Sequence, residues 1–166
     1  MTQPDQSDTR TAEPEVALIV GGGPGISASC ARLFTENGMR VAVAARDPNK
    51  PVLQALEKTH GVTLYQCDAS EPAAVESLFQ NVARDIGAPM LVVHNIDGRS
   101  MGVFRKGLAD VDASLVLDVL KNSAFSAFLV AQQSARLMIA QQPKANGAKG
   151  TIIFTNASAA LKGFAL

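Results

Sequence analysis

The sequence has 166 residues, enough for one domain with a buried core, and its 15 basic residues balance 15 acidic ones. A chain with zero net charge and 5% aromatic residues lacks the basic surface of a nucleic-acid-binding protein, and its short apolar runs predict no membrane partner. The two cysteines, Cys30 and Cys67, and the two histidines have no metal-ligand spacing, so we expect a cytoplasmic protein without a metal.

Short apolar runs alternate with longer amphipathic stretches along the chain. Residues 1–14 are polar and acidic, and we expect them to form a disordered leader. Residues 16–20 are apolar throughout, as in a strand covered on both faces. The glycine cluster at 21–25 follows, and a helix is predicted over 26–36 with an apolar face formed by Ile26, Cys30, Leu33 and Phe34.

The same alternation continues along the rest of the chain. Four further strands are predicted over 40–45, 62–67, 90–95 and 151–155. Three further helices are predicted: one that starts with the turn at 47–49 and ends at 60, one over 68–86 and one over 112–142. A loop over 97–109 has room for a short one. Strands that alternate with helices predict an α/β fold, a Rossmann-type doubly wound parallel sheet. Right-handed crossovers favour the strand order 3-2-1-4-5.

The glycine cluster is the strongest chemical signal in the sequence. A phosphate at a helix N-terminus meets unpaired N–H groups and the positive end of the helix dipole, and glycines leave room for it. Here the cluster follows an apolar strand and opens a helix, which is the context of a dinucleotide-binding motif; a bare tight turn is the alternative. The candidate cofactor-binding residues are Gly21, Gly23, Gly25 and Ile26.

The spacing of these residues resembles a known family. Residues 21–27 are similar to the motif Thr-Gly-x-x-x-Gly-x-Gly of short-chain dehydrogenases/reductases. Gly21 and Gly25 match it, whereas Val20 replaces the threonine and Ser27 the last glycine. The resemblance implies an oxidoreductase that transfers a hydride between a nicotinamide dinucleotide and a small-molecule carbonyl or alcohol.

The end of the second predicted strand bears on the choice of cofactor. An acidic residue there would bond the ribose 2′-hydroxyl of NAD, whereas an arginine accommodates the 2′-phosphate of NADP. By the family's register Ala45 occupies the acidic position and Arg46 follows, which favours NADP(H) over NAD(H). The alternative for Arg46 is a solvated surface charge. Asp47 lies one residue too late and is interpreted as the cap of the next helix.

Two further segments resemble landmarks of the family. Asp68 with Ala69 corresponds to the aspartate that ends the third strand and hydrogen-bonds the adenine ring, although the same carboxylate could cap the following helix. Residues 94–97 correspond to the family's Asn-Asn-Ala-Gly segment, in which Asn95 matches and lies near the cofactor ribose. His94 has no partner placed by the sequence and is interpreted as a strand residue.

The catalytic residues implied by the resemblance are a Tyr-x-x-x-Lys pair, a serine and a helix asparagine. The pair is absent from this sequence, whose only tyrosine, Tyr65, falls in the third strand. Residues 150–163 resemble the family's fifth strand and the loop after it, and aligning Gly163 puts Ala157 at the serine position with Ser158 one residue later. Ser158 is a candidate if the loop shifts by one residue, and otherwise an ordinary loop hydroxyl.

The helix asparagine has two candidates. Aligning on Phe128 puts Ser123 in the asparagine position and Asn122 just before it. Because neighbouring helix residues point ~100° apart, only one of the two is expected to face the site.

The resemblance covers 16–166, about two thirds of a typical family member, so we expect an NAD(P)-binding domain over 15–166 that is truncated after the fifth strand. Three hypotheses follow: an NADP(H)-dependent oxidoreductase that is inactive as this chain for lack of Tyr-x-x-x-Lys, a non-catalytic dinucleotide-binding module, or an inactive gene fragment. Members of this family usually pair through their long helix, so the resemblance implies a homo-oligomer whose contact is the predicted helix over 112–142.

Overall fold

The sheet is built from five parallel strands in the order β3-β2-β1-β4-β5, so the predicted fold class and strand order are confirmed. The computed structural model describes residues 13–104, 106–144, 146–157 and 161. Most of the expected leader, residues 1–12, therefore lies outside the described residues. The strands are β1 (Val16–Val20), β2 (Arg40–Ala45), β3 (Thr63–Gln66), β4 (Pro89–His94) and β5 (Thr151–Phe154).

The helices follow the predicted order with two differences. Asp68–Glu71 form a turn, so the third helix begins later than expected, and the long helix contains a π-helical turn, η2. The helices are α1 (Ile26–Glu36), α2 (Pro51–His60), α3 (Pro72–Asp85), α4 (Met101–Phe104), α5 (Ala113–Leu120) and α6 (Ser126–Ala140). The π turn η2 (Lys121–Phe125) joins α5 to α6, and a 3-10 turn, η1 (Leu108–Asp110), precedes α5.

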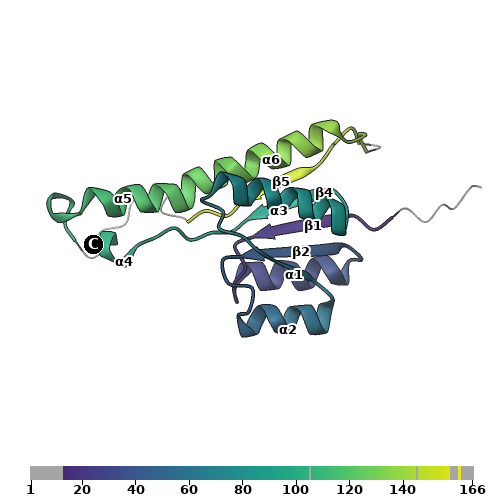
Figure 1. Ribbon diagram of the computed structural model, residues 1–166, viewed down its shortest axis with the longest axis horizontal. Helices are drawn as coiled ribbons and strands as arrows, with labels where there is room; N and C mark the ends of the chain where they lie inside the picture. Colours follow the sequence, from purple (N-terminus) through teal and green to yellow (C-terminus); the bar gives the residue numbers. More distant parts are fainter. Residues whose placement is uncertain (1–12, 105, 145, 158–160, 162–166) are drawn as a thin grey trace, which may run out of the picture.

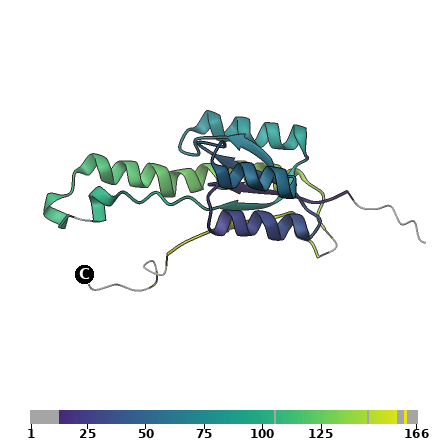
Figure 2. The same cartoon turned by 90° about the horizontal axis from the view of Figure 1, so that it is seen from below.

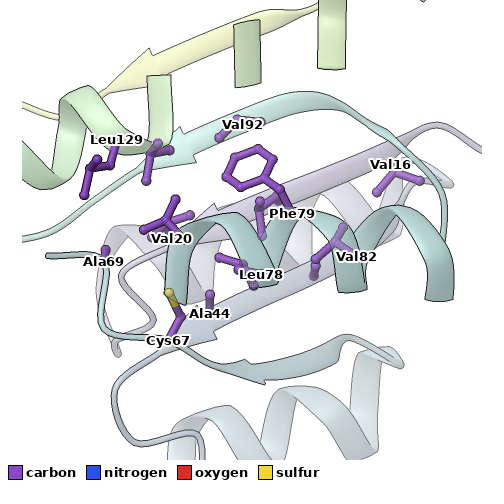
Figure 3. Packing of buried hydrophobic residues seen from close by; sticks show 14 of the residues in the cluster. Val16, Val20, Ala44, Cys67, Ala69, Leu78, Phe79, Val82, Val92 and Leu129 are labelled. Atoms are coloured by element: carbon purple, nitrogen blue, oxygen red, sulfur yellow. The ribbon is translucent and has the colours of Figure 1, made fainter. Parts of the chain in front are cut away.

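Helices cover both faces of the sheet, α1 and α2 on one side and α3 and α6 on the other (Figure 1). Successive β1 side chains point to opposite faces, so Val16, Leu18 and Val20 pack with α3 while Ala17 and Ile19 pack with α1 and α2. Figure 3 shows the α3 side of this core, with the ring of Phe79 directed toward the strands near Val92. Burial on both faces explains why β1 is apolar at every position.

Helix α1 buries a different stripe from the predicted one. Ile26 and Leu33 are each 55% exposed, while the fully covered residues are Ser27, Ala28 and Ala31. The predicted apolar face is therefore wrong for these two large residues. Small side chains let α1 lie close to the sheet, and Ile26 is left free at the mouth of the glycine loop.

The segments α5, η2 and α6 form one continuous helix, whose α5 end projects away from the sheet (Figure 2). By length and composition alone Ala113–Ala140 is apolar enough to cross a membrane, with only 17% of its most apolar window buried. Its buried stripe, including Leu129, Val130 and Met138, nevertheless belongs to the core shared with α3 and the sheet.

Candidate functional site

The glycine loop joins β1 to α1 at the edge where the parallel strands end. Gly21 has a φ of 104°, and a Cβ added to it would lie 2.2 Å from the carbonyl oxygen of Asn95. The N–H groups of Gly21 and Gly22 both donate to the carbonyl of Ala44, at 2.9 Å. Only glycine fits at position 21, because its backbone lies against the residue that follows β4.

The other side of the loop is open. Among the described residues, no heavy atom lies within 4 Å of a Cβ added to Gly23 or Gly25. Gly25 caps α1 without a side-chain hydrogen bond from any described residue. The N–H of Ala28 donates to the Gly23 carbonyl at 3.2 Å, so within the described chain the N–H groups of Ile26 and Ser27 are the ones left to an external acceptor. An open glycine backbone at a helix N-terminus fits the phosphates of a dinucleotide. The backbone at Gly23 and Gly25 is thus accessible from outside, and cofactor binding by Gly21, Gly23, Gly25 and Ile26 stays a prediction.

A chain of hydrogen bonds ties this loop to the ends of β4 and β5. The Ser27 hydroxyl donates to the Gly21 carbonyl at 2.7 Å and accepts from Asn95 Nδ2 at 2.7 Å. Asn95 Oδ1 in turn accepts from the Thr155 hydroxyl at 2.8 Å. Ser27, which replaces the last glycine of the family motif, is buried and fixes both the loop and Asn95. No motif in the sequence predicts this role of Ser27 or that of Thr155.

A first hollow of about 350 Å³ opens where β1, β2 and β3 end. It is lined by Val20, Arg46, Asp68, Ala69, Leu115 and Asn122, together with residues 96–100 of the loop after β4. The structure thus brings together three of the predicted cofactor-binding residues, Arg46, Asp68 and Ala69. Arg46 is exposed and lies on the wall of the hollow, so its charge faces whatever binds there.

Asp68 is held in an ionised form inside this hollow. Its Oδ1 accepts from the N–H and the hydroxyl of Ser70, at 3.0 and 2.8 Å. These bonds, the backbone one first, lower the pKa of Asp68, and the charge of Arg46 acts in the same direction. Helix α3 is capped at Glu71, so the alternative in which Asp68 caps this helix is wrong: the carboxylate closes the turn before the helix.

The expected cap role of Asp47 is corrected in the same way. Its Oδ1 accepts from the N–H of Asn49 at 2.9 Å, whereas the cap residue of α2 is Lys50. An aspartate three residues ahead of the cap residue closes a turn of its own, because its side chain accepts from the N–H two residues further along the chain.

A second hollow of about 440 Å³ lies beside the first, toward β5. It is lined by Ile26, Asn95, Ser123, Thr155, Asn156 and Ala157, and it shares residues 96–99 and Val119 with the first hollow. Ser123 lines this hollow and Asn122 lines the first, so only Ser123 of the two stands beside Asn95. Ala157, at the family's serine position, is part of the wall, whereas Ser158 lies outside the described residues.

His94 is a buried end-of-strand residue, as the sequence predicted. Its Nε2 lies 2.9 Å from the hydroxyl of Ser126, and its ring centroid is 6.0 Å from that of Phe154. Burial lowers the pKa of His94, so the ring is neutral near neutral pH. The contact joins β4 to the first turn of α6, where the Ser126 hydroxyl also donates to the carbonyls of Asn122 and Ser123.

Comparison with known proteins identifies the family. Residues 21–165 match the family model described as Enoyl-(Acyl carrier protein) reductase. The chain belongs to the short-chain dehydrogenase/reductase family. It is 32% identical over 157 residues to the short-chain dehydrogenase reductase ATA1 of Arabidopsis thaliana, covering 95% of this chain and 54% of that protein. It is also 32% identical over 149 residues to tropinone reductase-like 2 of Erythroxylum coca, covering 87% and 50%.

The structural comparison agrees with this assignment. The structure of an actinorhodin polyketide ketoreductase variant with NADPH is 27% identical and superposes with a TM-score of 0.77, covering 91% of this chain and 56% of that one. A short-chain dehydrogenase/reductase from Mycobacterium marinum gives a TM-score of 0.74 at 24% identity, covering 90% and 58%, and so shares the fold. The chain spans about half the length of the curated relatives it matches.

Proposed function

We propose that this chain binds NADP(H) in preference to NAD(H) and serves as the cofactor-binding part of an oxidoreductase acting on a small-molecule carbonyl or alcohol. The observation that carries the proposal is the position of Arg46, exposed on the wall of the first hollow and directly after the buried Ala45. No carboxylate occupies position 45 to accept from a ribose 2′-hydroxyl, and a guanidinium stands where a 2′-phosphate would need a partner.

A second cation supports the same preference. Lys50 Nζ lies 3.5 Å from the carbonyl of Gly22, which places an ammonium group at the β2 side of the glycine loop. Arg46 and Lys50 therefore flank the end of β2, and position 45, the last residue of this strand, is an alanine and not an acidic residue. A 2′-phosphate carries close to two negative charges near neutral pH, so two cations at this edge favour NADP(H) electrostatically.

Different described residues would bind different parts of the dinucleotide. When bound, the nicotinamide ring supplies the hydride acceptor or donor. The open glycine backbone at 23–25 would hold phosphates, and the carboxylate of Asp68 would accept a hydrogen bond from the adenine amino group. Asn95, held by Ser27 and Thr155, keeps the floor of the second hollow fixed. Ser123 and Ile26 line that hollow on either side of Asn95.

Removing the Arg46 charge tests the proposal. Binding of NADPH and of NADH is titrated by calorimetry for the wild-type chain, for Arg46→Ala and for Arg84→Ala, which removes an exposed arginine that lines neither hollow. We expect Arg46→Ala to weaken NADPH binding by about tenfold, the usual scale for a charged hydrogen bond, and to leave NADH binding within about twofold. Equal losses for both nucleotides, or no loss, would contradict the 2′-phosphate role.

A non-catalytic dinucleotide-binding module is the second candidate. It is favoured by Ala157, which stands in the second hollow at the family's serine position and offers no hydroxyl. NADPH oxidation with a panel of small aldehydes and ketones tests the module. Turnover above the buffer rate by this chain would contradict a non-catalytic module, whereas nucleotide binding without turnover is the result that the module predicts and that a cofactor-binding part without Tyr-x-x-x-Lys shares.

We also propose that the chain self-associates through the long helix. Apolar side chains left exposed on the described part of this helix include Leu117, Leu120, Phe125, Phe128 and Ile139. Phe125 and Phe128 stack with ring centroids 6.4 Å apart, which gives the patch a rigid aromatic centre. Light scattering after size exclusion should report a dimer or larger, and Phe128→Glu should shift it toward monomer.

A further inference from the structure

Residues 96–99 form the wall between the two hollows. Each of these residues lines both the first and the second hollow. Gly98 packs tightly against the π turn, since a Cβ added to it would lie 2.9 Å from Cβ of Ser123. A molecule that occupies both hollows must therefore cross this segment, and in a dinucleotide the diphosphate bridge is the part that joins the two halves.

The wall carries one charge of each sign. Arg99 Nε donates to both carboxylate oxygens of Asp97, at 2.7 and 2.8 Å, and its Nη2 donates to Oδ2. The backbone N–H of Arg99 also donates to Asp97 Oδ1 at 3.1 Å, so the turn itself holds the two residues together. The carboxylate is 56% exposed and the guanidinium 64% exposed, which means that both still face solvent in the cleft.

The charge balance of the first hollow makes Arg99 important. Among the described residues its charged lining groups are Arg46 and Arg99 against Asp68, Asp97 and Asp118. With Arg99 paired to Asp97, the wall is neutral; without Arg99, three carboxylates face one arginine. Two unit charges interact across several ångströms of water-filled cleft with an energy large enough to change an anion's affinity severalfold. Asp97 also corresponds to the glycine of the family's Asn-Asn-Ala-Gly segment, where no charge would arise.

We infer that Arg99 raises the affinity for an anionic dinucleotide by neutralising Asp97, so that the dinucleotide can lie across the wall between the two hollows. This inference rests on the proposed dinucleotide binding. The pair sets the electrostatic potential of the cleft and does little for stability, because an exposed ion pair contributes little to the free energy of folding. Removing either member therefore leaves the fold intact and changes binding with opposite signs.

The test is a double-mutant cycle on nucleotide affinity. NADPH binding is measured at low ionic strength by fluorescence of the dihydronicotinamide for wild type, Asp97→Asn, Arg99→Gln and the double variant, with Arg84→Gln as the matched exposed arginine outside both hollows. We expect Arg99→Gln to weaken binding about fivefold and Asp97→Asn to tighten it about twofold or more. The double variant should return to within about twofold of wild type, and raising the salt to 0.5 M should shrink every difference.

The outcomes distinguish a failure of the inference about Arg99 from a failure of the proposed dinucleotide binding. If wild type binds NADPH but Asp97→Asn is unchanged or weaker, Asp97 does not oppose the anion and the inference is wrong. If the double variant stays as weak as Arg99→Gln alone, Arg99 acts as a direct ligand and not by neutralising Asp97, which also overturns it. If folded wild-type chain binds neither NADPH nor NADH, the proposed function fails and this inference fails with it.

Discussion

Replacing Ser27 with alanine should destabilise the chain although it removes a single oxygen atom. Ser27 is 1% exposed, and its hydroxyl is the only described link between the glycine loop and the Asn95 side chain. Without it, the carbonyl of Gly21 loses a donor at 2.7 Å and Asn95 Nδ2 loses an acceptor at 2.7 Å. A buried polar group left without a partner costs about 1–3 kcal/mol, and both groups here are partly buried. We therefore expect a loss of about 2–3 kcal/mol in the free energy of unfolding.

The assay is urea unfolding followed by far-ultraviolet circular dichroism, with Ser29→Ala as the control. Ser29 lies on the same helix, and its hydroxyl accepts only an exposed bond from Arg32 Nη2 at 3.3 Å. Both changes gain the same helix propensity, so the difference between them isolates the buried hydroxyl. The control should stay within about 0.5 kcal/mol of wild type. A Ser27→Ala chain as stable as the control would refute the role given to this hydrogen-bond chain.

Three further predictions follow from the same geometry. Gly21→Ala should fail to fold or lose several kcal/mol, because its Cβ would lie 2.2 Å from the Asn95 carbonyl, whereas Gly23→Ala should melt close to wild type in a thermal scan. Burial lowers the pKa of His94, so the unfolded chain binds a proton at this histidine more readily than the folded chain does. The free energy of unfolding should therefore be at its full value above pH ~6.5 and fall as the pH drops below that. Urea titrations at several pH values should show this dependence for wild type and not for His94→Asn. The pKa of Tyr65 is raised to about 12, by burial first and then by its hydrogen bond to Asp85. This sole tyrosine of the sequence should therefore show almost no phenolate absorbance at pH ~10.5. A clear phenolate signal from the folded chain at that pH would contradict the placement of Tyr65.

The sequence was sufficient for the order of the elements and for the position of the loop. Residues 16–20 are apolar at every position because helices cover both faces of the sheet, and this pattern is visible in the amino-acid sequence alone. Gly21 was also identified, since its strand–glycine–helix context is local. These features depend on neighbours in the chain, so sequence patterns report them directly.

Other features depend on contacts that no local pattern records. Ser27 and Asn95, which are hydrogen-bonded to each other, are 68 residues apart, and Thr155, just after β5, bonds Asn95 from its other side. The apolar period placed Ile26 and Leu33 toward the core, whereas close packing of α1 on the sheet selected the small residues Ser27, Ala28 and Ala31. The helical period predicted that Asn122 and Ser123 would face different ways, but which of them lies beside Asn95 depends on how the long helix packs on the loop after β4.

The preference between the two nicotinamide dinucleotides tests the central proposal most directly. NADPH and NADH differ only in the 2′-phosphate. The ratio of their dissociation constants for the same wild-type chain therefore reports the binding free energy that the 2′-phosphate contributes beside Ala45, Arg46 and Lys50. Isothermal titration of a sample shown to be folded by circular dichroism should give NADPH binding that is at least about tenfold tighter. Tighter binding of NADH, or no binding of either nucleotide by the folded chain, would contradict the proposal.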